Sequence, residues 1–73
     1  MIVQIKTAVH DAASKNQKIA MFHFQVLKHA EELEGMEPEA FCREIGVPNT
    51  YQTEFRKMLS LARLMRELGV RLA

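Results

Sequence analysis

The amino-acid sequence predicts an all-α fold, a compact bundle of about four helices formed as one domain by residues 1–73. Three observations predict this fold class. Residues that favour helices, such as alanine, leucine, methionine, lysine and glutamate, are abundant. Apolar residues recur at spacings of three and four, and no two-residue alternation is long enough to predict a strand. The three glycines and two prolines fall between the periodic segments, where they separate successive helices.

The first predicted helix covers residues 2–14 and the second covers residues 17–34. Each has apolar residues at helical spacing, and the polar residues 14–16 separate the two. Gly35 is expected to end the second helix, because glycine readily adopts the left-handed conformation found after a helix. This helix is apolar on two sides, which predicts a place at the centre of the bundle. One stripe is Ile19, Phe22, Val26, Ala30 and Leu33, and the other is Ala20, Phe24 and Leu27.

A short third helix is predicted over residues 38–45. Pro38 suits the first helical position, where the N–H that proline lacks would have no partner within the helix. Met36 before it and Phe41 within it are placed like a hydrophobic staple. Gly46 is expected to end the helix.

The fourth predicted helix runs from about Asn49 to about Leu68. Asn49 is expected to cap the helix, and Gln52, three residues later, would complete a capping box. The apolar residues of this helix are Tyr51, Phe55, Met58, Leu59 and Ala62, followed by Leu61, Leu64, Met65 and Leu68.

Residues 38–68 have the layout of a helix-turn-helix, with a short helix, a tight turn and a longer helix that begins with polar residues. Gly46 suits the turn because glycine accepts a backbone angle that other residues resist. The residue four positions earlier must be small where the two helices cross, and Cys42 is small and apolar. In this motif the start of the second helix lies in the major groove of DNA.

The segment AFCREIGVPNTYQTEFRKMLSLA resembles small helix-turn-helix-like proteins of bacterial genomes and mobile elements. In those proteins a segment of the form EIA-x-x-AG(L/I)-x-x-SY-x-TEI-x-K-G follows an apolar helix rich in His, Phe and Ala. Here IAMFHFQVLKHAEELEGM occupies the place of that helix. The resemblance covers about residues 18–63 and implies DNA binding by a regulator. Gln52 departs from common repressors, which have an apolar residue there, so the second helix is expected to be rotated or the turn altered.

The candidate DNA-binding residues are the polar ones at the start of the fourth helix. Asparagine and glutamine can pair with adenine edges, arginine with guanine, and threonine with a thymine methyl group or a phosphate. Glu54 lies among them and would repel phosphate unless it pairs with Lys57 or Arg56. The alternative interpretation is that these residues are caps and solvated surface. The candidates are Asn49, Thr50, Gln52, Thr53, Arg56 and Lys57, with Arg43 and Lys18 as further phosphate contacts.

The formal net charge of +1 conceals an uneven distribution along the chain. Residues 1–30 contain four lysines and one aspartate, residues 31–46 contain six glutamates and one arginine, and residues 47–73 contain five basic and two acidic residues. Separate basic and acidic regions are compatible with nucleic-acid binding, and they are equally typical of a solvated helical protein. The acidic segment could mimic nucleic acid or dock a basic partner, but the favoured interpretation is solvated surface, which would point away from DNA if the fourth helix points towards it.

The second half of the fourth helix has more apolar residues than one small bundle is expected to cover. We predict a homodimer interface there, because exposed apolar patches mark association sites. The alternative is that the first two helices cover these residues. A second hypothesis for the function is a protein-interaction module, for example a phage or mobile-element protein that binds and inhibits a host protein. The predicted interface residues are Leu61, Leu64, Met65 and Leu68.

Several classes of protein are not expected. Cys42 is the only cysteine, which excludes an internal disulfide and favours a reducing cytoplasm. His10, His23 and His29 lack the close spacing of a zinc motif and are interpreted as surface or core-edge residues, so no metal or cofactor is predicted. No nucleophile constellation or phosphate-binding loop appears, and we predict that the protein is not an enzyme. No transmembrane helix, signal peptide or membrane partner is predicted.

Overall fold

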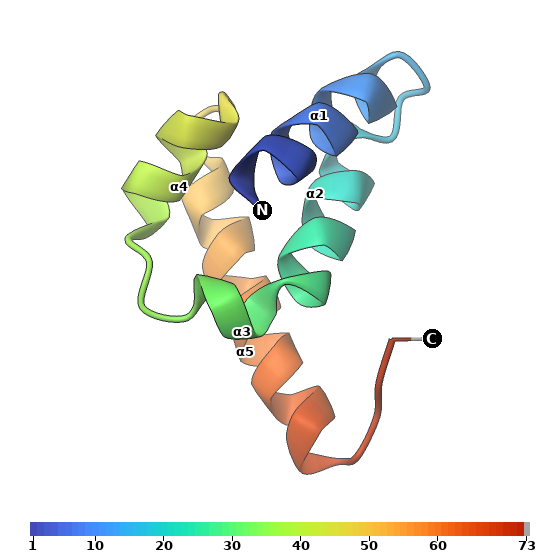
Figure 1. Cartoon of the computed structure of the whole chain (residues 1–73), viewed down its shortest axis with the longest axis vertical. Helices are drawn as coiled ribbons and strands as arrows, with labels where there is room; N and C mark the ends of the chain where they lie inside the picture. Colours follow the sequence, from blue (N-terminus) through green and yellow to red (C-terminus); the bar gives the residue numbers. More distant parts are fainter. Residues whose placement is uncertain (73) are drawn as a thin grey trace.

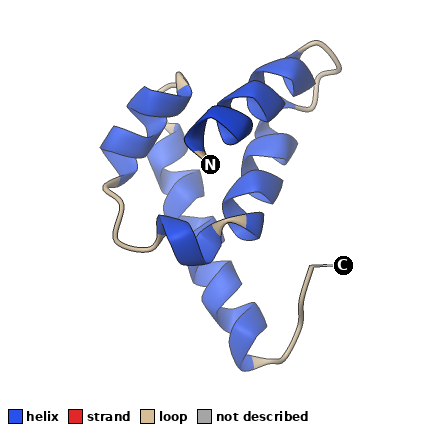
Figure 2. Ribbon diagram, viewed as in Figure 1, coloured by secondary structure: helices blue, strands red, loops and turns tan. Residues whose placement is uncertain are grey.

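The structure is a computed structural model that describes residues 1–72, and within that range it contains five α-helices and no strand (Figures 1 and 2). The predicted all-α fold class is therefore confirmed. Within the described residues no helix is both long and apolar enough to cross a membrane. The helices are α1 (Ile2–Ala13), α2 (Lys18–Lys28), α3 (Ala30–Leu33), α4 (Pro38–Ile45) and α5 (Tyr51–Glu67).

The longest helix, α5, organises the bundle. It packs against α2, α3 and α4, whereas α1 packs against α2 and α4 on the other side of the core. Figure 1 shows α1, α2 and α4 gathered around the first half of α5, while the second half of α5 projects below them. The two halves of α5 therefore lie in different surroundings.

Three phenylalanines from three different helices form the centre of the core. Phe22 of α2, Phe41 of α4 and Phe55 of α5 are all fully buried. The rings of Phe41 and Phe55 are stacked with centroids 4.6 Å apart, and the Phe22 and Phe41 centroids are 5.8 Å apart. Burying each such side chain stabilises the fold by about 1.5–3 kcal/mol. The other fully buried side chains are Ile5, Val9, Val26, Leu33, Cys42 and Ile45.

The predicted helix over residues 17–34 is interrupted at His29, so the chain forms two helices there rather than one. His29 has φ −106° and ψ 19°, outside the helical range, although its N–H still donates to the Gln25 carbonyl at 3.0 Å. The change of direction lets Leu33 of α3 reach the core together with Val26 of α2. Gly35, with φ +85°, follows α3 in the left-handed conformation that was predicted for it.

The prediction that the second helix is buried on two sides was wrong. The side of α2 with Phe22 and Val26 is buried, but Phe24 of the second stripe is 44 % exposed, and Ile19 of the first stripe is 41 % exposed. The reason is the number of neighbours: α2 packs against α1, α3 and α5, and no helix covers its outer side in the described part of the chain.

The predicted capping box at Asn49 and Gln52 was also wrong. The helix begins two residues later than Asn49, with Thr50 as its N-cap and no side-chain capping bond. The backbone carbonyls of Pro48 and Asn49 accept hydrogen bonds from the N–H groups of Tyr51 and Gln52, each at 3.0 Å. This tight turn already places Thr50 in a helical conformation (φ −60°, ψ −22°), so Asn49 is not at the cap position that its side chain would need.

Candidate nucleic-acid interface

The turn between α4 and α5 has the conformation that the sequence predicts. Gly46 has φ +80°, a left-handed conformation that residues with a Cβ rarely adopt. The N–H groups of Gly46 and Val47 both donate to the Cys42 carbonyl, at 2.9 and 3.1 Å. Cys42 is fully buried and Val47 is 8 % exposed, so the turn is closed by apolar contact as well as by hydrogen bonds.

A histidine of α1 holds this turn from the other side. His10 Nε2 lies 2.8 Å from the Ile45 carbonyl oxygen. A carbonyl can only accept, so Nε2 donates the hydrogen bond. The ring is also close to the turn glycine, because a Cβ on Gly46 would lie 3.4 Å from His10 Nε2. This role could not be predicted from the sequence, since the partners are 35 residues apart and no local pattern relates them.

The start of α5 is divided into a buried side and an exposed side. Phe55 is fully buried, and Tyr51 packs edge-on against Phe22 with ring centroids 5.0 Å apart. This arrangement agrees with the expected place of Tyr51 and Phe55 on the apolar side. Of the candidate DNA-binding residues, Gln52 is half-buried, whereas Asn49, Thr50, Thr53, Arg56 and Lys57 are exposed.

Glu54, the only acidic residue in the first two turns of α5, is paired on both of its oxygens. Its Oε1 lies 2.7 Å from Nε2 of His23 on α2, and its Oε2 lies 3.6 Å from Nζ of Lys57. The hydrogen bond from His23 is the main cause that lowers the pKa of the Glu54 carboxyl, with a smaller contribution from the charge of Lys57. The pairing with Lys57 was one of the two predicted alternatives, and the contact with His23 was not predicted.

Arg56 is exposed on α5, and within residues 1–72 no ion pair joins it to Glu54. Burial raises the pKa of the Cys42 thiol of α4, and the positive charge of Arg56 acts on it in the opposite direction. Arg56 and Lys57 are about 100° apart around the helix axis, and Thr53, one turn earlier, falls between them in that projection.

The two outlying candidates differ in position. Nζ of Lys18, at the start of α2, lies 5.8 Å from the centre of the Tyr51 ring, so this lysine is beside the start of α5. Arg43 lies on the exposed side of α4. Within residues 1–72 no hydrogen bond or ion pair joins Arg43 to α5. The structure thus brings Lys18 to the candidate interface and leaves Arg43 on a separate helix.

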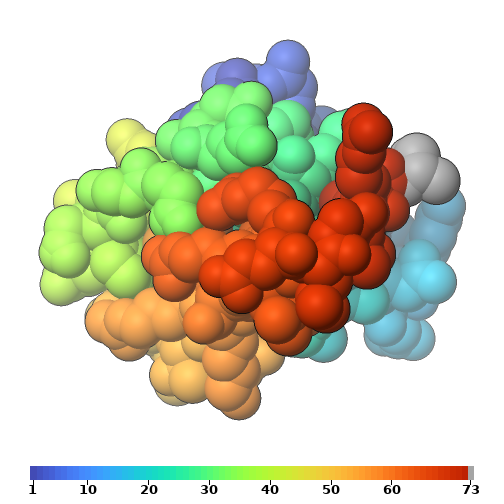
Figure 3. Space-filling view, turned by 90° about the horizontal axis from the view of Figure 1, so that it is seen from below, coloured from blue at the N-terminus to red at the C-terminus, as the bar shows by residue number. Residues whose placement is uncertain are grey.

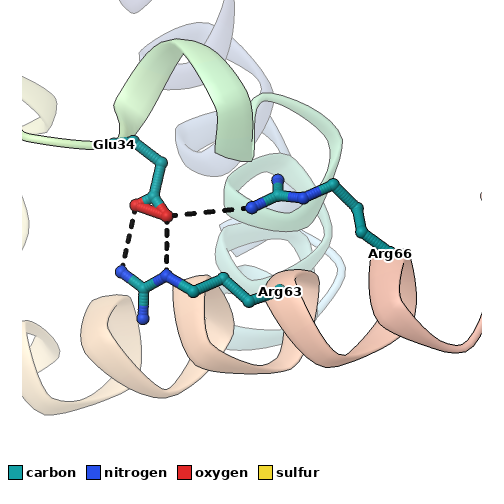
Figure 4. Close-up of polar contacts among 3 residues, drawn as sticks. All are labelled: Glu34, Arg63 and Arg66. Carbon is teal, nitrogen blue, oxygen red and sulfur yellow. Dashed lines mark hydrogen bonds and ion pairs between the residues drawn. The ribbon is translucent and has the colours of Figure 1, made fainter.

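The second half of α5 is fixed to α3 by an ion pair between two arginines and one glutamate (Figure 4). Nε and Nη2 of Arg63 donate to the two Glu34 oxygens at 2.8 and 3.0 Å, and Arg66 Nη2 is 3.9 Å from Oε1. The hydrogen bonds from Arg63 are the main cause that lowers the pKa of the Glu34 carboxyl. Two of the five basic residues of 47–73 are therefore paired with Glu34 at the end of α3.

Within residues 1–72 no group of three histidine, cysteine, aspartate or glutamate side chains is placed to hold a metal ion. The predicted interface residues Leu61, Leu64 and Leu68 are exposed, and Met65 is half-buried. The alternative that α1 and α2 cover these leucines is thus wrong.

Comparison with known protein families gives a match. The model of a family described as HTH-like domain matches residues 1–67, which includes all five helices. No curated protein and no solved structure matches the chain.

Proposed function

Because this chain belongs to the HTH-like domain family, we propose that it binds double-stranded DNA as a transcriptional regulator, with the start of α5 inserted into the major groove. The family match confirms the resemblance to helix-turn-helix-like proteins that the sequence suggested over residues 18–63, and it also includes α1. The two helices of the motif are α4 and α5, and Gly46 forms the turn that follows α4.

The main observation that supports this proposal is the exposed polar surface at the start of α5. Thr53, Arg56 and Lys57 point outward from a helix whose opposite side is anchored by the buried Phe55. A helix that presents such residues on a rigid support can enter the major groove and contact base edges. Asn49 and Thr50 lie in the exposed turn just before it, where they could contact bases or phosphates.

Glu54 is compatible with a DNA-binding surface because its negative charge is balanced. His23 and Lys57 both contact its carboxylate, so the charge is already paired within the protein. Lys18 adds a positive charge beside Tyr51, at the edge of the same surface. We propose that Lys18 and Arg43 contact phosphates on either side of the groove.

The first experiment measures binding of the Arg56→Ala/Lys57→Ala double variant to random-sequence duplex DNA by fluorescence anisotropy at several salt concentrations. The double variant is expected to bind roughly tenfold more weakly per lost phosphate contact near 0.1 M salt. The slope of log K against log salt should fall by about 1 for each contact.

The matched control is the Lys28→Ala/Arg71→Ala double variant. It removes the same charge, but both residues line a groove of about 310 Å³ at the other end of the bundle, where the end of α2 meets the second half of α5. We expect the control to keep most of the affinity and the salt slope of the original chain. Equal losses in the two double variants would show that only the total charge matters, and an original chain without affinity at low salt would refute DNA binding.

A further inference from the structure

Three titratable side chains meet where α2 packs against the start of α5. Nε2 of His23 lies 2.7 Å from Oε1 of Glu54, and Nζ of Lys57 lies 3.6 Å from Oε2 of the same carboxylate. Solvent reaches all three side chains, because His23 is 33 %, Glu54 29 % and Lys57 63 % exposed. We name His23, Glu54 and Lys57 the titratable cluster. It lies on the proposed DNA-binding surface, since Lys57 is one of the candidate residues.

The contact between His23 and Glu54 can form in both charge states of the histidine. An ionised carboxylate only accepts hydrogen bonds, so Nε2 carries a hydrogen whether the ring is neutral or charged. The proton that charges the ring is added to Nδ1, and none of the side-chain hydrogen bonds of residues 1–72 involves that atom. The ring can therefore gain a positive charge without moving away from Glu54.

The two partners of Glu54 hold its carboxylate with different strength. The 2.7 Å contact with His23 is a hydrogen bond, whereas the 3.6 Å between Lys57 and Oε2 exceeds the usual length of one. The hydrogen bond from His23 is also the main cause that lowers the pKa of the Glu54 carboxyl. Exposed ion pairs such as that of Lys57 contribute little, so a DNA phosphate can draw Lys57 away while His23 stays in place.

We propose that DNA binding by this chain takes up a proton at His23 and so becomes stronger as the pH falls; this inference rests on the proposed function. When Lys57 turns to a phosphate, Glu54 loses the cation that balanced it and repels the DNA. A proton from the solvent, added to Nδ1 of His23, restores the balance and leaves the charge of Lys57 for the phosphate. The effect falls at about pH 5–8, where histidine side chains ordinarily change their charge, and proton uptake on binding raises the affinity at the lower pH.

The charged groups near His23 can be traced through the helices that pack against α2, which are α1, α3 and α5. Those of α5 are the other two members of the titratable cluster. Asp11 and Lys15 of α1 line a groove together with Met21 of α2. Met21 is two residues before His23, which places it about 160° away around the helix axis. The charges of α1 therefore lie on another side of α2.

The charged residues of α3 lie at the other end of α2. Glu31 and Glu32 line the groove of about 310 Å³ together with Lys28, the last residue of α2. Figure 3 looks onto that end of the molecule, where the orange and red of α5 and the end of the chain occupy the centre. On α2 itself Lys18 lies beside the start of α5, and lysine side chains keep their charge at pH 5–8. Within the titratable cluster, the charge that changes in this range is that of His23.

The test measures the affinity of the chain for random-sequence duplex DNA by fluorescence anisotropy, at about 0.1 M salt and at pH values from about 5.5 to about 8. One additional charge on the interface is equivalent to about one phosphate contact, so binding should be roughly tenfold tighter at the lowest pH than at the highest. The His23→Gln variant keeps a side-chain donor but cannot take up the proton. Its affinity should stay near the value of the original chain at the highest pH throughout the range.

His29→Gln is the matched control, since His29 is half-buried at the break between α2 and α3 and no ion pair within residues 1–72 joins it to α5. This variant should keep the pH dependence of the original chain. Glu54→Gln removes the charge that the proton balances, so it should bind more tightly than the original chain at the highest pH and have a flatter pH dependence. It takes the place of His23→Gln if far-UV circular dichroism shows that His23→Gln has lost its helices.

The possible results separate this inference from the proposed function. If the original chain binds DNA with an affinity that does not change with pH, the inference is overturned and the proposed function stands. A His23→Gln variant with the pH dependence of the original chain also overturns it. Equal flattening in His29→Gln overturns it as well, because the total histidine charge would then be responsible. An original chain that binds no duplex at any pH refutes DNA binding and the proton uptake together.

Discussion

Gly46 shows how one residue determines the geometry of the whole candidate interface. Its left-handed conformation turns the chain from α4 into α5, and its N–H closes the end of α4 on the Cys42 carbonyl. The ring of His10 lies close to this glycine and donates to the Ile45 carbonyl immediately before the turn. The glycine could be predicted from the sequence because its requirement is local, whereas the histidine contact depends on the folded arrangement of α1 and α4.

Replacing Gly46 with alanine is expected to lower the free energy of unfolding by about 1–2 kcal/mol, the cost of a Cβ in the left-handed region. The new Cβ would lie 3.4 Å from His10 Nε2, an ordinary contact distance, so only a small further loss is expected. Urea denaturation followed by circular dichroism measures the effect. Gly35→Ala is the control, because Gly35 has the same left-handed conformation (φ +85°) but no atom lies within 4 Å of its new Cβ. It should therefore show the cost of the conformation alone. A neutral Gly46→Ala would contradict the assigned turn conformation.

At the scale of elements, local signals predicted where helices end better than they predicted which sides are buried. Proline and glycine marked α4 correctly at both ends, because their effects act on the backbone of neighbouring residues. Phe24 looked like a core residue, since apolar spacing alone does not show how many helices surround α2. The break at His29 was missed for a similar reason, because the burial of Leu33 requires a change of direction that only the packed bundle imposes.

Part of the candidate interface could be predicted from the sequence. The polar positions of early α5 followed from helical periodicity once Phe55 was placed in the core. The contact of Glu54 with His23 could not be predicted, since the two residues are 31 positions apart and belong to helices whose relative placement was unknown. The sequence indicated that the charge of Glu54 needs a partner, but both partners that it indicated, Lys57 and Arg56, lie on the same helix.

The helix α1 offers a direct test of its place in the bundle. Ile5 is fully buried, and Val3, two residues earlier on the same helix, is 75 % exposed. Ile5→Ala is expected to lower the free energy of unfolding by about 2–5 kcal/mol, because it leaves a cavity in the core. Val3→Ala should change this free energy by no more than about 0.5 kcal/mol. Thermal and urea denaturation of both variants measure the difference, and similar values for the two would mean that α1 is packed differently.

At the scale of the whole molecule, two carboxylates join separate helices to α5. Glu34 connects α3 to the second half of α5 through Arg63, and Glu54 receives His23 of α2 at the first half. Both contacts are on the surface, where single ion pairs contribute little. Their combined effect should nevertheless be visible as a dependence of stability on pH, because the pKa of each carboxyl is lowered in the folded chain.

The free energy of unfolding should be constant above about pH 5 and should decrease as the pH falls toward about 3. The unfolded chain, in which both carboxyls have ordinary pKa values, takes up protons first, so acid favours unfolding until the folded carboxyls are protonated too. Urea denaturation at a series of pH values measures this dependence. A Glu34→Gln/Glu54→Gln double variant should show a flatter profile, and an unchanged profile would show that these contacts do not form in solution.

The core phenylalanines have a consequence for protein engineering. Phe41 and Phe55 belong to the helix-turn-helix, but Phe22, which packs against Phe41, comes from α2, and the donor to the Ile45 carbonyl comes from α1. The motif therefore cannot be transferred to another protein on its own. A graft of residues 38–68 onto another scaffold would expose two aromatic rings to water and leave a helix end without its donor, so a chimaera must inherit the first two helices as well.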